Sequence, residues 1–172
     1  MLEFDVRELF EALDARRIER ELSWRGVADE IWNLSAELNA RRHDHPISPA
    51  TLTGMPKQGF TSCQHALFML RWLECAPESF LAGGSVPTAA PLPLAGPDRR
   101  LRWNLARLYE ALDGQRRERA LTWPELAREL RCTPHQLTGI RTARFAIDMN
   151  LAMKIVQWLG RPAADFVDAA GW

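Results

Sequence analysis

Two groups of side chains in this 172-residue sequence have the residue types found in metal or catalytic sites. His43, Asp44 and His45 offer imidazole and carboxylate ligands, but no partner at a suitable spacing completes a four-ligand site, and a polar loop tip explains them. Cys63 lies near His65, as a thiolate and its base would, yet a small buried thiol at the start of a helix is the better interpretation. The sequence has no paired carboxylates, glycine-rich phosphate loop or Ser-His-Asp pattern. We therefore expect no enzyme, no metal and no cofactor.

The sequence reads as two copies of one unit. Shifting it by 99 positions aligns Leu9–Ile31 with Leu108–Leu130, and about half of these positions are identical. Leu-Thr-Gly then recurs at an offset of 85, and "ALFMLRWLECAPESFL" matches "AMKIVQWLGRPAADFV" at an offset of 86. The repeat predicts two small domains, at residues 1–81 and 99–172. The first carries an insertion at about 33–46, and a Pro/Gly/Ala-rich linker at 82–98 joins the two.

Apolar residues recur with a helical period in the second copy. A stripe on the first helix comprises Leu101, Leu105, Leu108, Tyr109 and Leu112. Thr122 with Glu125 predicts a capping box at the start of a second helix, and Thr133-Pro134 begins a third at 134–141. A fourth helix runs from Asp148 to Gly160, and "PAADFV" makes a last turn or short helix. Since no segment alternates apolar and polar residues, we predict an all-α fold with strand content near zero.

The first copy repeats this order, with a third helix at 49–55. Leu34 and Leu38 continue the apolar stripe of its second helix from Ile31, so the insertion is expected to prolong that helix until Pro46 stops it. The basic tip at residues 41–45 is open to two interpretations, a contact with phosphates or a solvated loop.

The zero net charge conceals an asymmetry between the copies. Residues 1–81 have 9 basic and 13 acidic side chains, whereas residues 99–172 have 13 and 8. The second copy is therefore the better partner for a polyanion. No apolar run is long enough for a membrane span and the first 30 residues are charged, so we expect a cytoplasmic protein without membrane contact.

Tryptophan positions also follow the repeat. Trp24 matches Trp123 and Trp72 matches Trp158, which predicts core positions for all four. The unmatched residues are expected at a seam between the copies or between subunits; they are Trp32, Trp103 and Trp172.

The order of elements resembles the Cro/repressor-type (XRE-type) helix-turn-helix proteins. The resemblance is carried by "LTWPELARELRCTPHQLTGIRTARF" and "LAMKIVQWLGRPAADFV" in copy two, and more loosely by "LSWRGVADEI" and "ISPATLTGM" in copy one. It implies small helical bundles that bind double-stranded DNA sequence-specifically, usually as transcriptional repressors, with the third helix in the major groove. At the tight turn Arg131-Cys132 stands where the family commonly has glycine, so a left-handed turn residue would carry a side chain.

Polar side chains of the two third helices are the predicted DNA contacts. On 134–141, Gln136 suits an adenine edge and Arg141 suits guanine or a phosphate. The backbone amides at Thr133 to His135 lie at a helix N-terminus that accepts phosphate oxygens, and Arg144 is predicted to anchor a phosphate. The full predicted set in copy two is Thr133, His135, Gln136, Thr138, Arg141, Thr142 and Arg144. In copy one it is Ser48, Ala50, Thr51, Thr53, Lys57, Gln58 and Arg25.

Several alternatives stay open. The copies either form an intrachain pseudo-dimer on an asymmetric site, or copy two reads DNA while copy one binds a second chain or a protein partner. The second function class is a helical interaction or antitoxin-like protein that keeps the fold without reading bases, an alternative favoured by the neutral net charge and by Gly54 and Gly139. Salt dependence separates the two classes, because only phosphate binding weakens steeply with salt.

Overall fold

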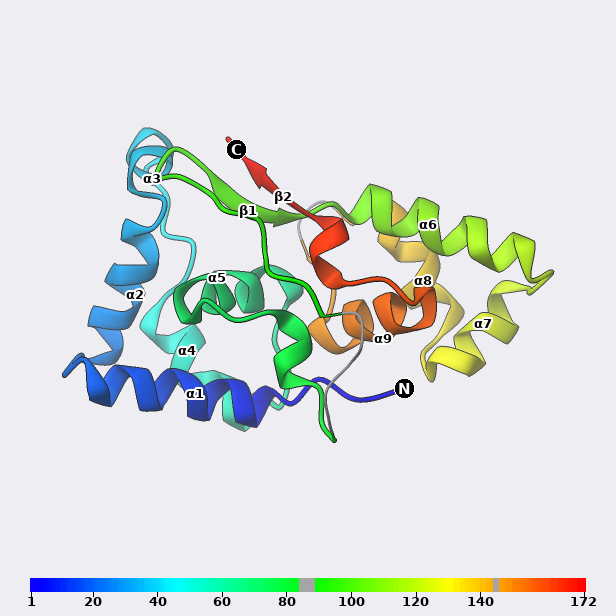
Figure 1. Ribbon diagram of the computed structural model, residues 1–172, viewed down its shortest axis with the longest axis horizontal. Coiled ribbons are helices and arrows are strands. Elements are labelled where there is room, and N and C mark those ends of the chain that lie inside the picture. The colour runs from blue at the N-terminus through cyan, green and yellow to red at the C-terminus, as the bar shows by residue number, and fades with distance from the viewer. Residues whose placement is uncertain (84–88, 144–145) are drawn as a thin grey trace.

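The computed structural model describes residues 1–83, 89–143 and 146–172, and most of these residues are helical (Figure 1). The first half contains α1 (Val6–Glu19), α2 (Trp24–Asn33), α3 (Ala36–Arg42), α4 (Pro49–Gln58), α5 (Cys63–Leu73) and the 3-10 helix η1 (Pro77–Phe80). The second half contains β1 (Arg100–Trp103), α6 (Leu105–Glu118), α7 (Trp123–Leu130), α8 (Pro134–Gly139), η2 (Ile140–Thr142), α9 (Met149–Leu159), η3 (Ala163–Phe166) and β2 (Val167–Ala170).

Short polar side chains fix where most helices begin. Thr122 and Glu125 form the predicted capping box at α7, and Asp148 caps α9, which ends at the left-handed Gly160 as expected. Ser48 and Thr133 cap α4 and α8 in the same way, each followed by proline in the first turn. Proline is tolerated there because the first amides of a helix have no intrahelical acceptor.

The same side-chain contacts occur in both halves. The rings of Phe10 and Trp24 stack at 5.1 Å, and those of Tyr109 and Trp123 stack at 5.7 Å. Behind them, the indole of Trp72 donates to Glu30 at 2.8 Å, and that of Trp158 donates to Glu129 at 2.7 Å. Each contact of the second half lies at the sequence offset, 99 or 86, that relates the two copies.

Backbone pairing joins the halves at equivalent positions. The amide of Cys63 donates to the carbonyl of Ile147 at 2.8 Å, and that of Met149 donates to Thr61 at 2.9 Å, on either side of an antiparallel bridge between Ser62 and Asp148. Ser62 and Asp148 differ by the offset of 86, so the bridge joins a residue to its own counterpart. In Figure 1, a half turn about an axis normal to the page brings α1 onto α6 and α2 onto α7. We call this axis the pseudo-two-fold axis.

Each half lays the segment before its first helix on the other half. Residues 2–4 lie on α9, where Gln157 donates to Leu2 and Asn150 accepts from Phe4, both at 2.9 Å. On the other side, β1 lies on α5, where the side chain of Gln64 donates to Leu101 at 2.8 Å. The indole of Trp103 donates to Cys63 at 3.0 Å, so this tryptophan lies at the seam between the halves. Buried apolar side chains of both halves consequently form one cluster.

The expectation of near-zero strand content was wrong at one place. β1 and β2 pair antiparallel in the register Arg100↔Ala170 to Trp103↔Val167. Leu101 therefore belongs to a strand, and α6 starts only at Leu105, capped by the side chain of Asn104. The apolar spacing of Leu101 fitted a helix, but pairing with a segment more than 60 residues away determines its conformation.

The insertion was expected to prolong the second helix, and this expectation was wrong. α2 ends at Asn33, α3 is a separate helix, and α3 ends at the left-handed His43 before Pro46 is reached. The chain turns at Ser35, whose hydroxyl donates to the carbonyl of Arg99 at 2.6 Å. The third helices also differ in extent from the prediction, because α4 continues to Gln58, and α8 passes into η2 after Gly139.

The insertion fastens the segment that leads into β1. The guanidinium of Arg100 donates to the side-chain oxygen of Asn39 through Nε at 2.9 Å and through Nη2, and its Nη1 pairs with Asp44 at 2.9 Å. The amides of Glu37 and Leu38, at the start of α3, both donate to the carbonyl of Pro97. We call the contact of Arg100 with Asn39 and Asp44 the Arg100 clasp.

Candidate nucleic-acid interface

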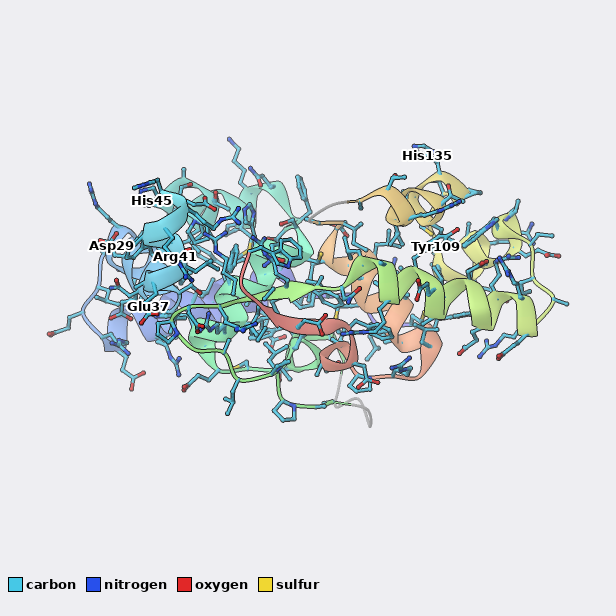
Figure 2. All side chains as sticks on the ribbon, turned by 90° about the horizontal axis from the view of Figure 1, so that it is seen from above. Asp29, Glu37, Arg41, His45, Tyr109 and His135 are labelled. Carbon is cyan, nitrogen blue, oxygen red and sulfur yellow. The ribbon has the colours of Figure 1, made fainter. Side chains whose placement is uncertain are left out.

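The two predicted third helices, α4 and α8, lie on the same face of the molecule. In Figure 1 both lie behind α5 and α9, one on each side of the pseudo-two-fold axis. In Figure 2 the molecule is seen from above, and α4 and α8 lie along its upper side, with His135 of α8 labelled at the upper edge. We call this side the α4–α8 face.

On the second half, the described members of the predicted set are all exposed. Leu137 and Ile140 are buried in the core as expected, which leaves the polar side chains outside. The exposed residues are Thr133, His135, Gln136, Thr138, Arg141 and Thr142. Arg144 lies outside the described residues.

Gln136 is held in a second capping box. Its Oε1 accepts from the amide of Thr133 at 2.8 Å and from the hydroxyl of Thr133 at 3.1 Å, while its own amide donates to that hydroxyl oxygen at 3.2 Å. The side-chain Nε2 is left as the donor that a base or phosphate can use. A bidentate pair with adenine needs both atoms, so it requires Gln136 to leave the cap.

The phosphate site predicted at the start of α8 has fewer free backbone donors than expected. Thr133 donates its amide to Gln136, and Pro134 has no amide hydrogen. Of the three residues named, only His135 can therefore offer a backbone donor to a phosphate in this arrangement.

On the first half, the predicted residues again lie at the surface. Thr51 is half-buried, and the others are exposed: Arg25, Ser48, Ala50, Thr53, Lys57 and Gln58. The two surfaces differ in reach, since α4 exposes only small side chains through its first turns and its long donors follow at Lys57 and Gln58.

One threonine hydroxyl in each of the two helices donates within its own helix. Thr53 donates to Pro49 at 3.1 Å, and Thr138 donates to Pro134 at 3.2 Å. Thr142, in η2, donates to Gly139 at 3.2 Å. With the hydroxyl hydrogen used locally, each of these side chains offers an acceptor lone pair and a methyl group. A methyl group suits contact with the methyl of thymine more than polar reading of a base edge.

The insertion places charged side chains near α4. The sequence had left open whether its basic tip contacts phosphates or forms a solvated loop. In Figure 2, His45 lies above Arg41 and nearer the upper side of the molecule. The C-terminal end of α3 therefore points to the α4–α8 face. Asp29 is exposed on the same half and lines, with Arg25 and His45, a cleft of about 650 Å³ beside the start of α4. The carboxylate of Asp29 would repel a polyanion at this cleft. The first half therefore carries both positive and negative side chains on this face, whereas the second half presents Arg141 and His135.

Arg131 confirms one local prediction. It caps α7 with φ 54° and ψ 50°, the left-handed conformation expected for this turn. The side chain there carries the steric cost that glycine would avoid. The neighbouring thiol of Cys132 is half-buried, and burial raises its pKa.

Neither metal nor membrane chemistry is indicated in the part of the chain that the structure describes. Those residues include no group of three or more His, Cys, Asp or Glu side chains that could hold a metal ion, and none of their helices is long and apolar enough to cross a membrane. No protein-family model, curated protein or solved structure matches this chain.

Proposed function

We propose that this protein is a sequence-specific double-stranded DNA-binding protein, a transcriptional regulator of the repressor type, built from two Cro/repressor-type helix-turn-helix units in one chain. The observation that carries the proposal is the placement of α4 and α8. Both begin with a Ser/Thr-Pro cap, both expose polar side chains, and they flank the pseudo-two-fold axis on one face (Figure 2). In the helix-turn-helix proteins that this chain resembles, two helices related by a two-fold axis occupy successive major grooves, about 34 Å apart on one side of B-DNA.

In this proposal the chain acts as its own dimer. α5 and α9 meet at the axis, and each half holds the leading segment of the other. A homodimer needs a second chain to bring two third helices together, whereas here covalent linkage does so at any concentration.

The proposed DNA site is asymmetric. Gln136 and Arg141 read one half-site, and the methyl-bearing start of α4 with Lys57 and Gln58 reads the other. Since the two sets share no long donor at equivalent positions, the half-sites should differ in sequence, and the half bound by α8 should be the more specific.

The test is selection from a random double-stranded DNA library at near-physiological salt, followed by sequencing of the bound fraction. Two unlike half-sites, with centres about 10 base pairs apart, are expected. Affinity for the selected site should fall linearly with the logarithm of salt, with a slope of about 0.9 for each phosphate contacted. Absence of enrichment would reject the proposal in favour of the helical interaction or antitoxin-like alternative, and the search would turn to a protein partner.

Two substitutions at Gln136 separate base reading from helix capping. Gln136→Ala removes both, whereas Gln136→Glu keeps the acceptor of the capping box and removes the Nε2 donor. Both variants should lose discrimination at one base pair by about 1 to 3 kcal/mol. Only Gln136→Ala should also lower thermal stability. Unchanged specificity in both variants would remove Gln136 from the interface.

A further inference from the structure

An aromatic ring is exposed between α4 and α5. Phe60 follows Gly59, the left-handed residue that ends α4 with φ 72°, and 58% of its surface is accessible. Among the described residues, the other large exposed apolar side chains lie at the chain ends, in the linker or on the outer surface of α1: Met1, Trp172, Leu94 and Ile18. An aromatic side chain left in water forgoes the free energy of its burial, which makes such a position a candidate contact.

Phe60 lies next to the pseudo-two-fold axis. The three residues after it, Thr61 to Cys63, are those that pair with Ile147 to Met149 across the axis. At the offset of 85 that relates the Leu-Thr-Gly segments, the counterpart of Phe60 is Phe145, which lies outside the described residues. Among the described residues, Phe60 is therefore the large exposed apolar side chain that lies beside the axis.

The axis has a defined position relative to bound DNA. α4 and α8 lie on one face, on either side of the axis (Figures 1 and 2). When two helices occupy successive major grooves on one side of B-DNA, the duplex midway between them turns its minor groove toward the protein. Phe60 lies in the chain between the end of α4 and the residues that pair at the axis, so the proposal places its ring opposite that minor groove.

We infer that Phe60 is a wedge that enters the minor groove at the centre of the DNA site and partly unstacks one base-pair step. The inference rests on the proposed function. Apolar side chains inserted between base pairs in this way kink the duplex toward the major groove by about 20 to 90°. Burial of the ring against the bases offsets part of the unstacking cost. Because the minor groove at the kink faces the protein, a bend toward the major groove turns both ends of the DNA site away from the protein.

The wedge predicts sequence preference without a base-specific hydrogen bond. Pyrimidine–purine steps unstack and kink most readily, so TA or CA/TG should be enriched at the centre of the selected sites.

The test uses the full-length chain and a selected DNA site with 2-aminopurine at the central step and fluorophores at the two ends. Wild type should raise the 2-aminopurine fluorescence through unstacking and shorten the end-to-end distance through bending. Phe60→Ala should lose both signals, while Phe60→Leu, which keeps an apolar wedge, should retain most of both. Ile18→Ala, which removes an equally exposed side chain from α1, is the matched control and should behave as wild type.

Each contrary result has one meaning. If Phe60→Ala binds the same sites with an unchanged bend and unchanged fluorescence, there is no wedge and the proposed function stands. If sedimentation shows a dimer of the chain that Phe60→Ala dissociates, while the bend is unaffected, the ring covers a second copy and the wedge is again rejected. If the wild-type chain selects no DNA, both the proposed function and the wedge fall.

Discussion

Replacement of Arg100 by methionine measures how strongly the insertion holds the segment that enters β1. The Arg100 side chain is only 3% exposed and makes the three polar contacts of the clasp, two to Asn39 and one to Asp44. Methionine keeps most of the aliphatic volume but none of the donors. The change therefore tests the polar contacts with little disturbance of the packing.

The cost can be worked out partner by partner. Asn39 is fully buried, and without Arg100 its Oδ1 has no partner, which costs about 1 to 3 kcal/mol. The Asp44 side chain is 36% exposed, so loss of its ion pair adds no more than about 1 kcal/mol. We expect a total of about 3 kcal/mol, which for a chain of this size lowers the Tm by about 6 to 12 °C.

The assay is urea and thermal unfolding of wild type, Arg100→Met and Arg99→Ala. Arg99 is the matched control, because its side chain is about half exposed and makes only long contacts, and its replacement should cost less than about 0.5 kcal/mol. A double-mutant cycle with Asp44→Asn isolates the ion pair from the Asn39 contacts.

Acid provides an independent check on the clasp. Burial raises the pKa of Asp44, but hydrogen bonds and charges from Arg100 and Arg42 outweigh it and hold that pKa below the ordinary value of 3.8. A lowered pKa contributes stability that is present above the ordinary value and is lost as the pH falls through the folded-state value. The gap between wild type and Arg100→Met should therefore narrow below about pH 4. Equal stability of Arg100→Met and Arg99→Ala at pH 7 would refute the reasoning.

Three further predictions concern single side chains. Glu78 is buried, burial raises its pKa, and its Oε1 accepts from the amide of Ala163 at 2.6 Å. Glu78→Gln should therefore gain stability relative to wild type as the pH rises above 4.5, the ordinary pKa of a glutamate. Unfolding at pH 4 and at pH 7 measures this difference. The opposite trend would mean that the charged form is the stabilised one. Burial raises the pKa of Cys63 to about 12, so this thiol should resist alkylation at pH 8 in the folded chain while Cys132 reacts, as mass mapping of the labelled peptides would show. Thr133→Ala removes the capping box of α8 and should lower the free energy of unfolding by about 1 kcal/mol, a change that Thr133→Ser should largely restore in denaturant titrations.

Helix starts were predictable because their signals are local. Thr122, Asp148 and Thr133-Pro134 each combine a capping side chain with the first residue of a helix, and all three caps form. The same pattern, Thr-x-x-Gln at Thr133 and Gln136, also predicts a capping box, but Gln136 was assigned only to base reading. Its Oε1 accepts from the amide of Thr133 in that box, so the local pattern was sufficient to predict this contact.

Features that depend on distant segments were not predictable. The helical spacing of Leu101 suggested a longer first helix, because nothing nearby shows that residues 100–103 pair with residues 167–170. The clasp between Arg100 and Asn39 joins residues 61 positions apart. The axis contacts of Thr61 to Cys63 are made by backbone atoms, so no side-chain pattern marks them. The exposure of Phe60 became meaningful only once the axis was placed.

The two halves share their contacts at the pseudo-two-fold axis and differ at their surfaces. Contacts at the pseudo-two-fold axis use backbone amides and carbonyls, which tolerate different side chains, and they recur symmetrically. Differences collect at the surface, where the α3 insertion occurs once and the net charge is −4 over residues 1–81 but +5 over residues 99–172. In a homodimer each of these features would appear twice and the bound DNA site would be symmetric. Under the proposed function, a single chain that keeps the axis while its halves diverge distinguishes the two ends of a DNA site, and it should therefore bind in one orientation.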